Sequence, residues 1–150
     1  MLKRSLSVSL LALALLSATA SSVSAKPTDW DKELAKGYQQ LSIGNKEVAA
    51  EFFAKKVAKY PGSAACHTAL GKALKRLGKL DEAKKEFRSA TQCEPTFADG
   101  FYEFGSSLEA DGQYKEAIEN FQKYLELSQD AAKRKNIEDR IRFCQDKLSS

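Results

Sequence analysis

Three side chains near the middle of the chain could bind a metal ion or exchange thiols: Cys66, His67 and Cys93. Thiolate and imidazole are the ligands that zinc prefers in proteins. A structural zinc site needs four ligands, and neither a fourth ligand nor a known zinc spacing accompanies these three. We therefore expect His67, the only histidine, to be a core residue packed between helices, with no metal bound.

Catalysis has even fewer candidate residues. The sequence contains no nucleophile motif, no phosphate-binding loop and no pair of carboxylates set apart from the charged surface of its helices. With a single histidine beside these absences, nothing organises a reaction. We expect a protein that is not an enzyme and that uses no cofactor.

The first 25 residues have the three parts of a secretory signal peptide. Lys3 and Arg4 give a positive start, residues 6–16 form an uncharged apolar run, and small residues lead to Ala25. A membrane-spanning helix needs about 20 apolar residues, so this run is too short to be an anchor. We expect export with cleavage after Ala25, or alternatively after Ala20, to a periplasm or out of the cell. The signal favours a bacterial source.

The charge pattern beyond the signal excludes one class of partner. Removing Lys3 and Arg4 lowers the formal net charge from +4 to +2, and charges of both signs alternate along the rest of the chain. Such a balance is typical of an ordinary solvated helical surface and gives no reason to expect nucleic acid. No second apolar run is long enough to cross a bilayer, so we expect no membrane span after cleavage.

The elements that must position these side chains follow a strict period. Ala, Lys, Glu, Leu and Gln dominate the mature sequence, which predicts an all-helical protein. Identical residues also recur three times at four positions of a 34-residue interval, and a proline occurs twice at the same interval. The recurring sets are Gly37, Gly71 and Gly105; Gly44, Gly78 and Gly112; Ala49, Ala83 and Ala117; Phe53, Phe87 and Phe121; and Pro61 and Pro95, with Gln129 in the third place.

Each recurring residue has a physical role in a pair of packed helices. A glycine costs about 1 kcal/mol in a helix interior, so Gly71 predicts a close approach of the second helix, with Ala83 facing it. Gly78 predicts a left-handed turn that ends the first helix. Phe87 should fill the space between one pair and the next, and Pro95 should end the second helix.

This pattern resembles the tetratricopeptide repeat, a helix–turn–helix unit of 34 residues. The signature is clearest in "LGKLDEAKKEFRSATQCEP" and "DGQYKEAIENFQKYLEL". The resemblance implies an all-α fold, a right-handed solenoid of antiparallel helix pairs. It divides residues 28–148 into repeats at 28–61, 62–95 and 96–129, followed by a capping helix at 130–148.

The two ends of the array depart from the pattern. The capping helix should bury a stripe of Ile137, Ile141, Cys144 and Leu148, with charged residues on its other faces. The first helix of repeat one instead carries an apolar stripe of Trp30, Leu34, Tyr38 and Leu41. That stripe is either an end variant that needs no neighbour or an exposed surface for a partner.

Proteins of this family mostly bind a peptide or another protein along the concave face, which the first helices line. The resemblance therefore implies a non-enzymatic adaptor or scaffold with a protein or peptide ligand. Such a groove would be apolar, then basic, then acidic, and would suit a segment with an acidic centre. The alternative is a solvated charged face. The residues implied are Leu34, Tyr38, Leu41, Thr68, Lys72, Lys75, Arg76, Asp99, Tyr102, Glu103, Ser106 and Glu109.

One specialisation of the family is not expected here. Some of its members grip the terminal carboxylate of cytosolic heat-shock chaperones with Lys, Asn and Arg side chains. The matching positions hold Leu34, Tyr38, Ala69, Asp99 and Glu103. Two carboxylates at the third site would repel a terminal carboxylate, which agrees with export.

Three further hypotheses concern the cysteines and the apolar stripe of the first helix. Cys66 and Cys93 lie at neighbouring ends of antiparallel helices and could form a disulfide, worth roughly 3.5 kcal/mol in the chain-entropy model. The alternative is two small hydrophobes, with Cys144 a core residue of the cap. A structural role, with homo-oligomers joined through Trp30, Leu34 and Tyr38, is a rival function. A redox or metal protein using Cys66, His67 and Cys93 is a weaker one.

Overall fold

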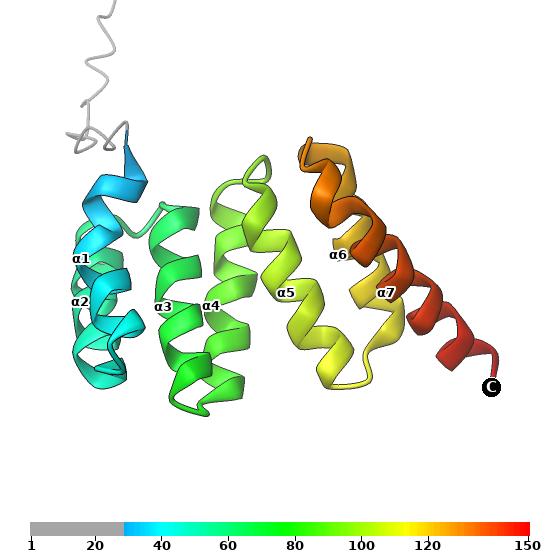
Figure 1. Cartoon of the computed structure of the whole chain (residues 1–150), viewed down its shortest axis with the longest axis horizontal. Helices are drawn as coiled ribbons and strands as arrows, with labels where there is room; N and C mark the ends of the chain where they lie inside the picture. Colours follow the sequence, from blue (N-terminus) through cyan, green and yellow to red (C-terminus); the bar gives the residue numbers. More distant parts are fainter. Residues whose placement is uncertain (1–28) are drawn as a thin grey trace, which may run out of the picture.

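The computed structural model describes residues 29–150, and this range folds into α-helices without any strand. The expected all-α class is confirmed, whereas the predicted signal peptide lies outside the described residues. Figure 1 shows the helices as successive antiparallel hairpins, with α1, α3 and α5 in one layer and α2, α4 and α6 behind them. Their bounds are α1 Trp30–Ser42, α2 Lys46–Lys59, α3 Ala64–Arg76, α4 Leu80–Cys93, α5 Ala98–Ala110, α6 Tyr114–Leu127 and α7 Ala131–Ser149.

The helix ends follow from the local sequence. The hydroxyl of Ser63 accepts a hydrogen bond from the Cys66 backbone N–H at 3.3 Å, and Asp130 caps the start of α7 in the same way. After α3, Gly78 adopts a φ of +78°, a left-handed conformation that glycine tolerates without Cβ strain. Pro95 follows the end of α4 and prevents its continuation. The predictions made for Gly78 and Pro95 are confirmed, whereas the caps at Ser63 and Asp130 were not predicted.

The helices of each pair meet at the glycine, but an aromatic ring is the nearest neighbour. A Cβ built at Gly71 would lie 2.4 Å from Cε1 of Phe87, and the same contact joins Gly37 to Phe53. The three atoms nearest to that Cβ all belong to Phe87, so this ring, and not Ala83 as expected, is the closest neighbour of Gly71. Phe87 is fully buried against the glycine of its own pair.

Two clusters of buried side chains run through the array. One joins α1 to α4 and is built around Phe53 and Phe87, while the other joins α5 to α7 around Phe121 and Tyr124. Phe104 on α5 packs against both clusters. The stacked pairs therefore share a continuous apolar interior, as a repeat protein requires.

The apolar stripe of α1 packs inside the first pair. Leu34 is 2% exposed, the Trp30 ring lies 5.4 Å from that of Tyr60, and the Tyr38 ring lies 5.1 Å from that of Phe53. The stripe is not an open apolar surface. Self-association through Trp30, Leu34 and Tyr38 would have only the partly buried Trp30 and Tyr38 to use, and it stays a prediction.

The helix α7 packs on α6 and closes this end of the array (Figure 1). Ile137, Ile141 and Cys144 are buried, as the stripe predicted. The prediction that Leu148 is buried on the same stripe is wrong, because its side chain is 56% exposed. The packed part of α7 therefore ends about one turn before the helix itself.

Candidate functional site

A groove of about 460 Å³ lies on the layer formed by α1, α3 and α5. One wall comes from the end of α1, the other from the last turns of α3, and α5 adds one carboxylate. Six residues predicted from the sequence meet here, together with one that the sequence reasoning missed, Ser42. The groove is lined by Tyr38, Leu41, Ser42, Lys72, Lys75, Arg76 and Glu103.

The charges in the groove partly neutralise one another. Glu103 is only 9% exposed, and its carboxylate oxygens lie 3.6 Å from Nζ of Lys72 and 3.5 Å from Nζ of Lys75. Within residues 29–150 no ion pair is formed by Arg76, whose side chain is exposed. The expected basic centre thus consists of two lysines that share one carboxylate and of one guanidinium without an ion pair in this range. The guanidinium of Arg76 is the group best placed to meet an anionic partner.

Tyr38 provides a neutral hydrogen-bonding group at the apolar end of the groove. Burial raises the pKa of its hydroxyl to about 12, and the carboxylates of Asp99, Asp31 and Glu103 act in the same direction. The hydroxyl therefore keeps its proton at any physiological pH and can donate a hydrogen bond. Beside it, Leu41 contributes partly exposed apolar surface.

The predicted acidic end of the groove is occupied by α7. Arg140 donates to Glu109 Oε2 from Nε at 2.8 Å and to the Ser106 hydroxyl from Nη1 at 2.9 Å. Its guanidinium also stacks 4.5 Å from the ring centre of Phe121 and 5.6 Å from that of Tyr102. Glu109 and Tyr102 consequently serve to hold the capping helix and do not line the groove.

The remaining predicted residues are dispersed. Leu34 and Thr68 are buried, and Asp99 is exposed on α5 outside the groove lining. Arg140 was missed because it is one of several cations in the capping helix. The only sequence signal for this contact was the group of acidic residues on the first helix of repeat three, which would attract a cation.

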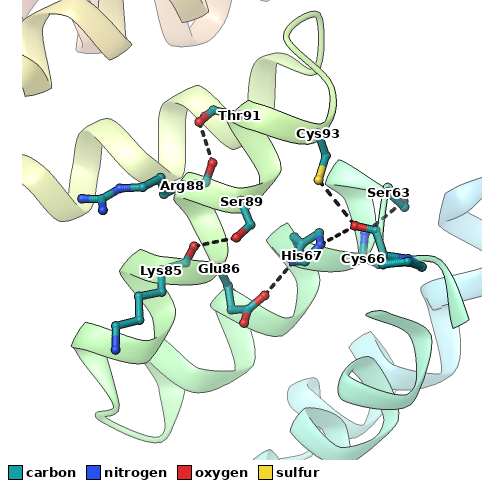
Figure 2. A network of polar contacts seen from close by, with 10 residues as sticks. Ser63, Cys66, His67, Lys85, Glu86, Arg88, Ser89, Thr91 and Cys93 are labelled. Atoms are coloured by element: carbon teal, nitrogen blue, oxygen red, sulfur yellow. Dashed lines mark hydrogen bonds and ion pairs between the residues drawn. The ribbon is translucent and has the colours of Figure 1, made fainter. Parts of the chain in front are cut away.

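His67 is a structural residue, as predicted. The ring is 8% exposed and joins α4 to the turn before α3, with Nδ1 2.7 Å from Glu86 Oε2 and Nε2 2.9 Å from the carbonyl oxygen of Pro61 (Figure 2). Both partners are acceptors, so both bonds need a protonated ring nitrogen. The hydrogen bond to Glu86 raises the pKa of His67, although burial opposes it.

The cysteines are free thiols in the structure, and Cys66 is not joined to Cys93. Cys93 is exposed, and its Sγ lies 3.5 Å from the Pro61 carbonyl oxygen that His67 also contacts (Figure 2). Burial raises the pKa of the Cys66 and Cys144 thiols, which lowers their thiolate content. Cys66 and Cys144 fit the small-hydrophobe alternative, whereas Cys93 does not.

Neither a metal centre nor a membrane span is found in the described part of the chain. Residues 29–150 contain no cluster of three or more His, Cys, Asp and Glu side chains arranged to hold a metal ion. None of the helices in this range is both long and apolar enough to cross a bilayer.

Comparison with known proteins now identifies the repeat. The sequence model of the family described as "Tetratricopeptide repeat" matches residues 64–97 and 98–130, which contain α3–α4 and α5–α6. The chain contains tetratricopeptide repeats. In this tetratricopeptide-repeat protein the pair α1–α2 has the same glycine-to-phenylalanine contact as the matched repeats, although the match does not include it.

One curated relative shares detectable sequence with this tetratricopeptide-repeat chain. It is the Small glutamine-rich tetratricopeptide repeat-containing protein 2 of Mycosarcoma maydis, which is 29% identical over 104 residues. The alignment covers 65% of this chain and 30% of the relative. The chain therefore spans less than a third of that protein's length.

Solved structures share the fold. The Yersinia enterocolitica Type III Secretion Translocator Chaperone SycD matches with a TM-score of 0.71 at 15% identity, covering 83% of this chain and 90% of SycD. The first TPR of Spaghetti (RPAP3), bound to the HSP90 peptide SRMEEVD, matches with a TM-score of 0.70 at 20% identity over 79% of this chain and 95% of that one. At these identities the likeness establishes the tetratricopeptide-repeat fold alone.

Proposed function

We propose that this protein is an exported, non-enzymatic adaptor that binds a peptide or protein segment in the groove between α1, α3 and α5. The observation that carries the proposal is the groove itself, where Leu41, Tyr38 and Arg76 combine apolar surface, a neutral donor and a cation without an ion pair in residues 29–150. A site of this kind binds and orients a ligand, and it contains no group arranged to transform one.

Structural relatives support a role in binding polypeptides. One solved structure holds SycD in complex with a peptide of the translocator YopD, and another holds a Spaghetti repeat domain with an HSP90 peptide. In our proposal, the segment bound here occupies the groove on the first-helix layer. Its acidic residue meets Arg76 and an apolar residue lies on Leu41, while Glu103 disfavours a second acidic residue near the lysines.

A charge reversal in the groove tests the proposal. Arg76→Glu should weaken partner binding by at least about tenfold, because it repels the anionic group that Arg76 attracts, and tenfold corresponds to about 1.4 kcal/mol. The partner is captured from envelope extract by photocrosslinking from an unnatural residue placed at Ser42, and its binding is then titrated with purified components.

A matched variant separates the groove from general charge. Lys55→Glu makes the same type of change on an exposed site of α2, outside the groove lining. We expect Lys55→Glu to retain the partner. If folded Arg76→Glu protein retains every partner at full affinity, or if both variants lose binding equally, the groove is not the binding site.

Export has its own test. Mass spectrometry of the protein from its native envelope fraction should show a chain that starts at Lys26, or at Ser21 if cleavage follows Ala20. A cytosolic chain that still begins with residue 1 or 2 would contradict the export proposal without affecting the binding proposal.

A further inference from the structure

A second groove lies between the first two helix pairs, on the side of the second helices. It has a volume of about 350 Å³ and is bounded by α2, α3 and α4. Leu70 and Leu74 of α3 form its floor, and Ala50 and Ala54 of α2 form one wall. None of these residues lines the groove proposed above, so the two sites use different faces of α3.

The repeat provides an internal comparison for this groove. Thirty-four residues further along, between α4 and α6, the positions of Ala50 and Ala54 are held by Lys84 and Arg88. The Arg88 guanidinium lies 5.4 Å from the ring centre of Phe104, which is the counterpart of Leu70. Long side chains on α4 therefore cover the floor of the second inter-pair space, and a cation already rests on its apolar surface.

An ion pair between Lys84 and Asp111 also helps to cover the floor of the second inter-pair space. The Lys84 ammonium makes an ion pair with Asp111, which anchors the side chain across the space toward the end of α5. At the corresponding position of the first space, Ala50 has no side chain long enough to cross. The first inter-pair space is therefore open where α2 presents Ala50 and Ala54 in place of long side chains.

The rim of the open groove is acidic. Glu51, Glu82 and Glu86 carry three carboxylates around it, against the single ammonium of Lys85. Glu51 and Glu82 are exposed, and their ion pairs with neighbouring lysines on the same element are of a kind that contributes only about 0–1 kcal/mol. Glu86 is held more firmly by His67. An incoming cation could therefore displace the lysine partners of Glu51 and Glu82 at small cost.

We infer that this groove binds an apolar polypeptide segment flanked by arginine or lysine. An aliphatic side chain of the segment lies on Leu70 and Leu74, and the adjacent cation pairs with Glu51 or Glu82. The bound segment would thus cover the apolar floor between α2 and α4, as the Arg88 side chain covers Phe104 between α4 and α6. Its charge is opposite to that of the segment proposed for the first groove, so one adaptor holds two different segments on two faces.

Methyl NMR with a defined probe tests this site. The probe is a short acetylated peptide in which two leucines are flanked by arginines. Titration into the full protein should shift the methyl signals of Leu70 and Leu74 and leave those of Leu41 in place. A peptide with glutamates in place of the arginines should bind at least about tenfold more weakly, because it is repelled by the rim.

The repeat also supplies the variant that should close the site. Ala50→Lys with Ala54→Arg transplants the covering side chains to positions whose counterparts carry them, so the fold should tolerate the change. We expect at least a tenfold loss of peptide affinity. Gln122→Arg adds one positive charge at the exposed counterpart of Ala54 in α6 and should leave affinity unchanged.

Three results would overturn the inference. They are unmoved Leu70 and Leu74 methyl signals at millimolar peptide, equal binding of the acidic peptide, and full affinity in the folded double variant. None of these results bears on Arg76 and the first groove, so the two proposals succeed or fail separately.

Discussion

Replacing Gly71 by alanine should destabilise the protein, although alanine is the better helix former. A Cβ at this position would lie 2.4, 2.7 and 2.9 Å from three atoms of the Phe87 ring, and the ring is fully buried. Overpacking of a core typically costs about 1–3 kcal/mol, and three such contacts place this site near the upper value. The higher helix propensity of alanine stabilises the fold by about 1 kcal/mol and offsets part of this cost. We expect a net loss of about 2 kcal/mol.

Urea denaturation followed by circular dichroism measures this loss as a lower transition midpoint at unchanged slope. Gly62→Ala is the matched control, because a Cβ there meets no atom within 4 Å and its backbone φ is not positive. It should change stability by no more than about 0.5 kcal/mol.

A double-mutant cycle identifies Phe87 as the cause. In a Phe87→Leu background the alanine at Gly71 should cost at least about 1 kcal/mol less, since the ring atoms it meets are gone. The reasoning is refuted if Gly71→Ala is as stable as the original protein, or if its cost is the same in both backgrounds.

Three further changes have defined outcomes. Because the pKa of His67 is raised in the folded state, its bond to Glu86 should stabilise the fold fully at acidic pH. This stabilisation, measured against His67→Gln, should disappear as pH rises through the folded-state pKa. Arg140→Ala should lower the unfolding free energy by roughly 2 kcal/mol, because a partly buried Glu109 loses its charged donor. Gly78→Ala should cost about 1–2 kcal/mol through its positive φ alone.

The 34-residue period predicted most of the fold because each recurring residue has one dominant backbone consequence. Gly78 needs a left-handed turn, and Pro95 cannot continue a helix, so the period placed hairpins and their ends correctly. The contact partner of Gly71 could not be read in the same way. Ala83 and Phe87 are four residues apart and share one helix face, so periodicity cannot tell which of them covers the glycine.

The site was less predictable because it depends on which ion pairs the long charged side chains form. The sequence showed acidic residues on α5, but Glu103 pairs with lysines from α3 while Glu109 pairs with Arg140 from α7. Many cations in the sequence could have made either contact. The open groove beside Ala54 was also missed, because an absence of long side chains is visible only by comparison with Arg88.

The position of Phe104 between the two apolar clusters has a consequence for how the molecule behaves under stress. A linear stack whose units touch only their neighbours can fray from one end while the other stays intact. One aromatic ring that belongs to both halves makes the loss of either half costly to the other. The two halves should therefore unfold in one cooperative step under a pulling force or during proteolysis. A ligand held across α1, α3 and α5 would then be released in that same step.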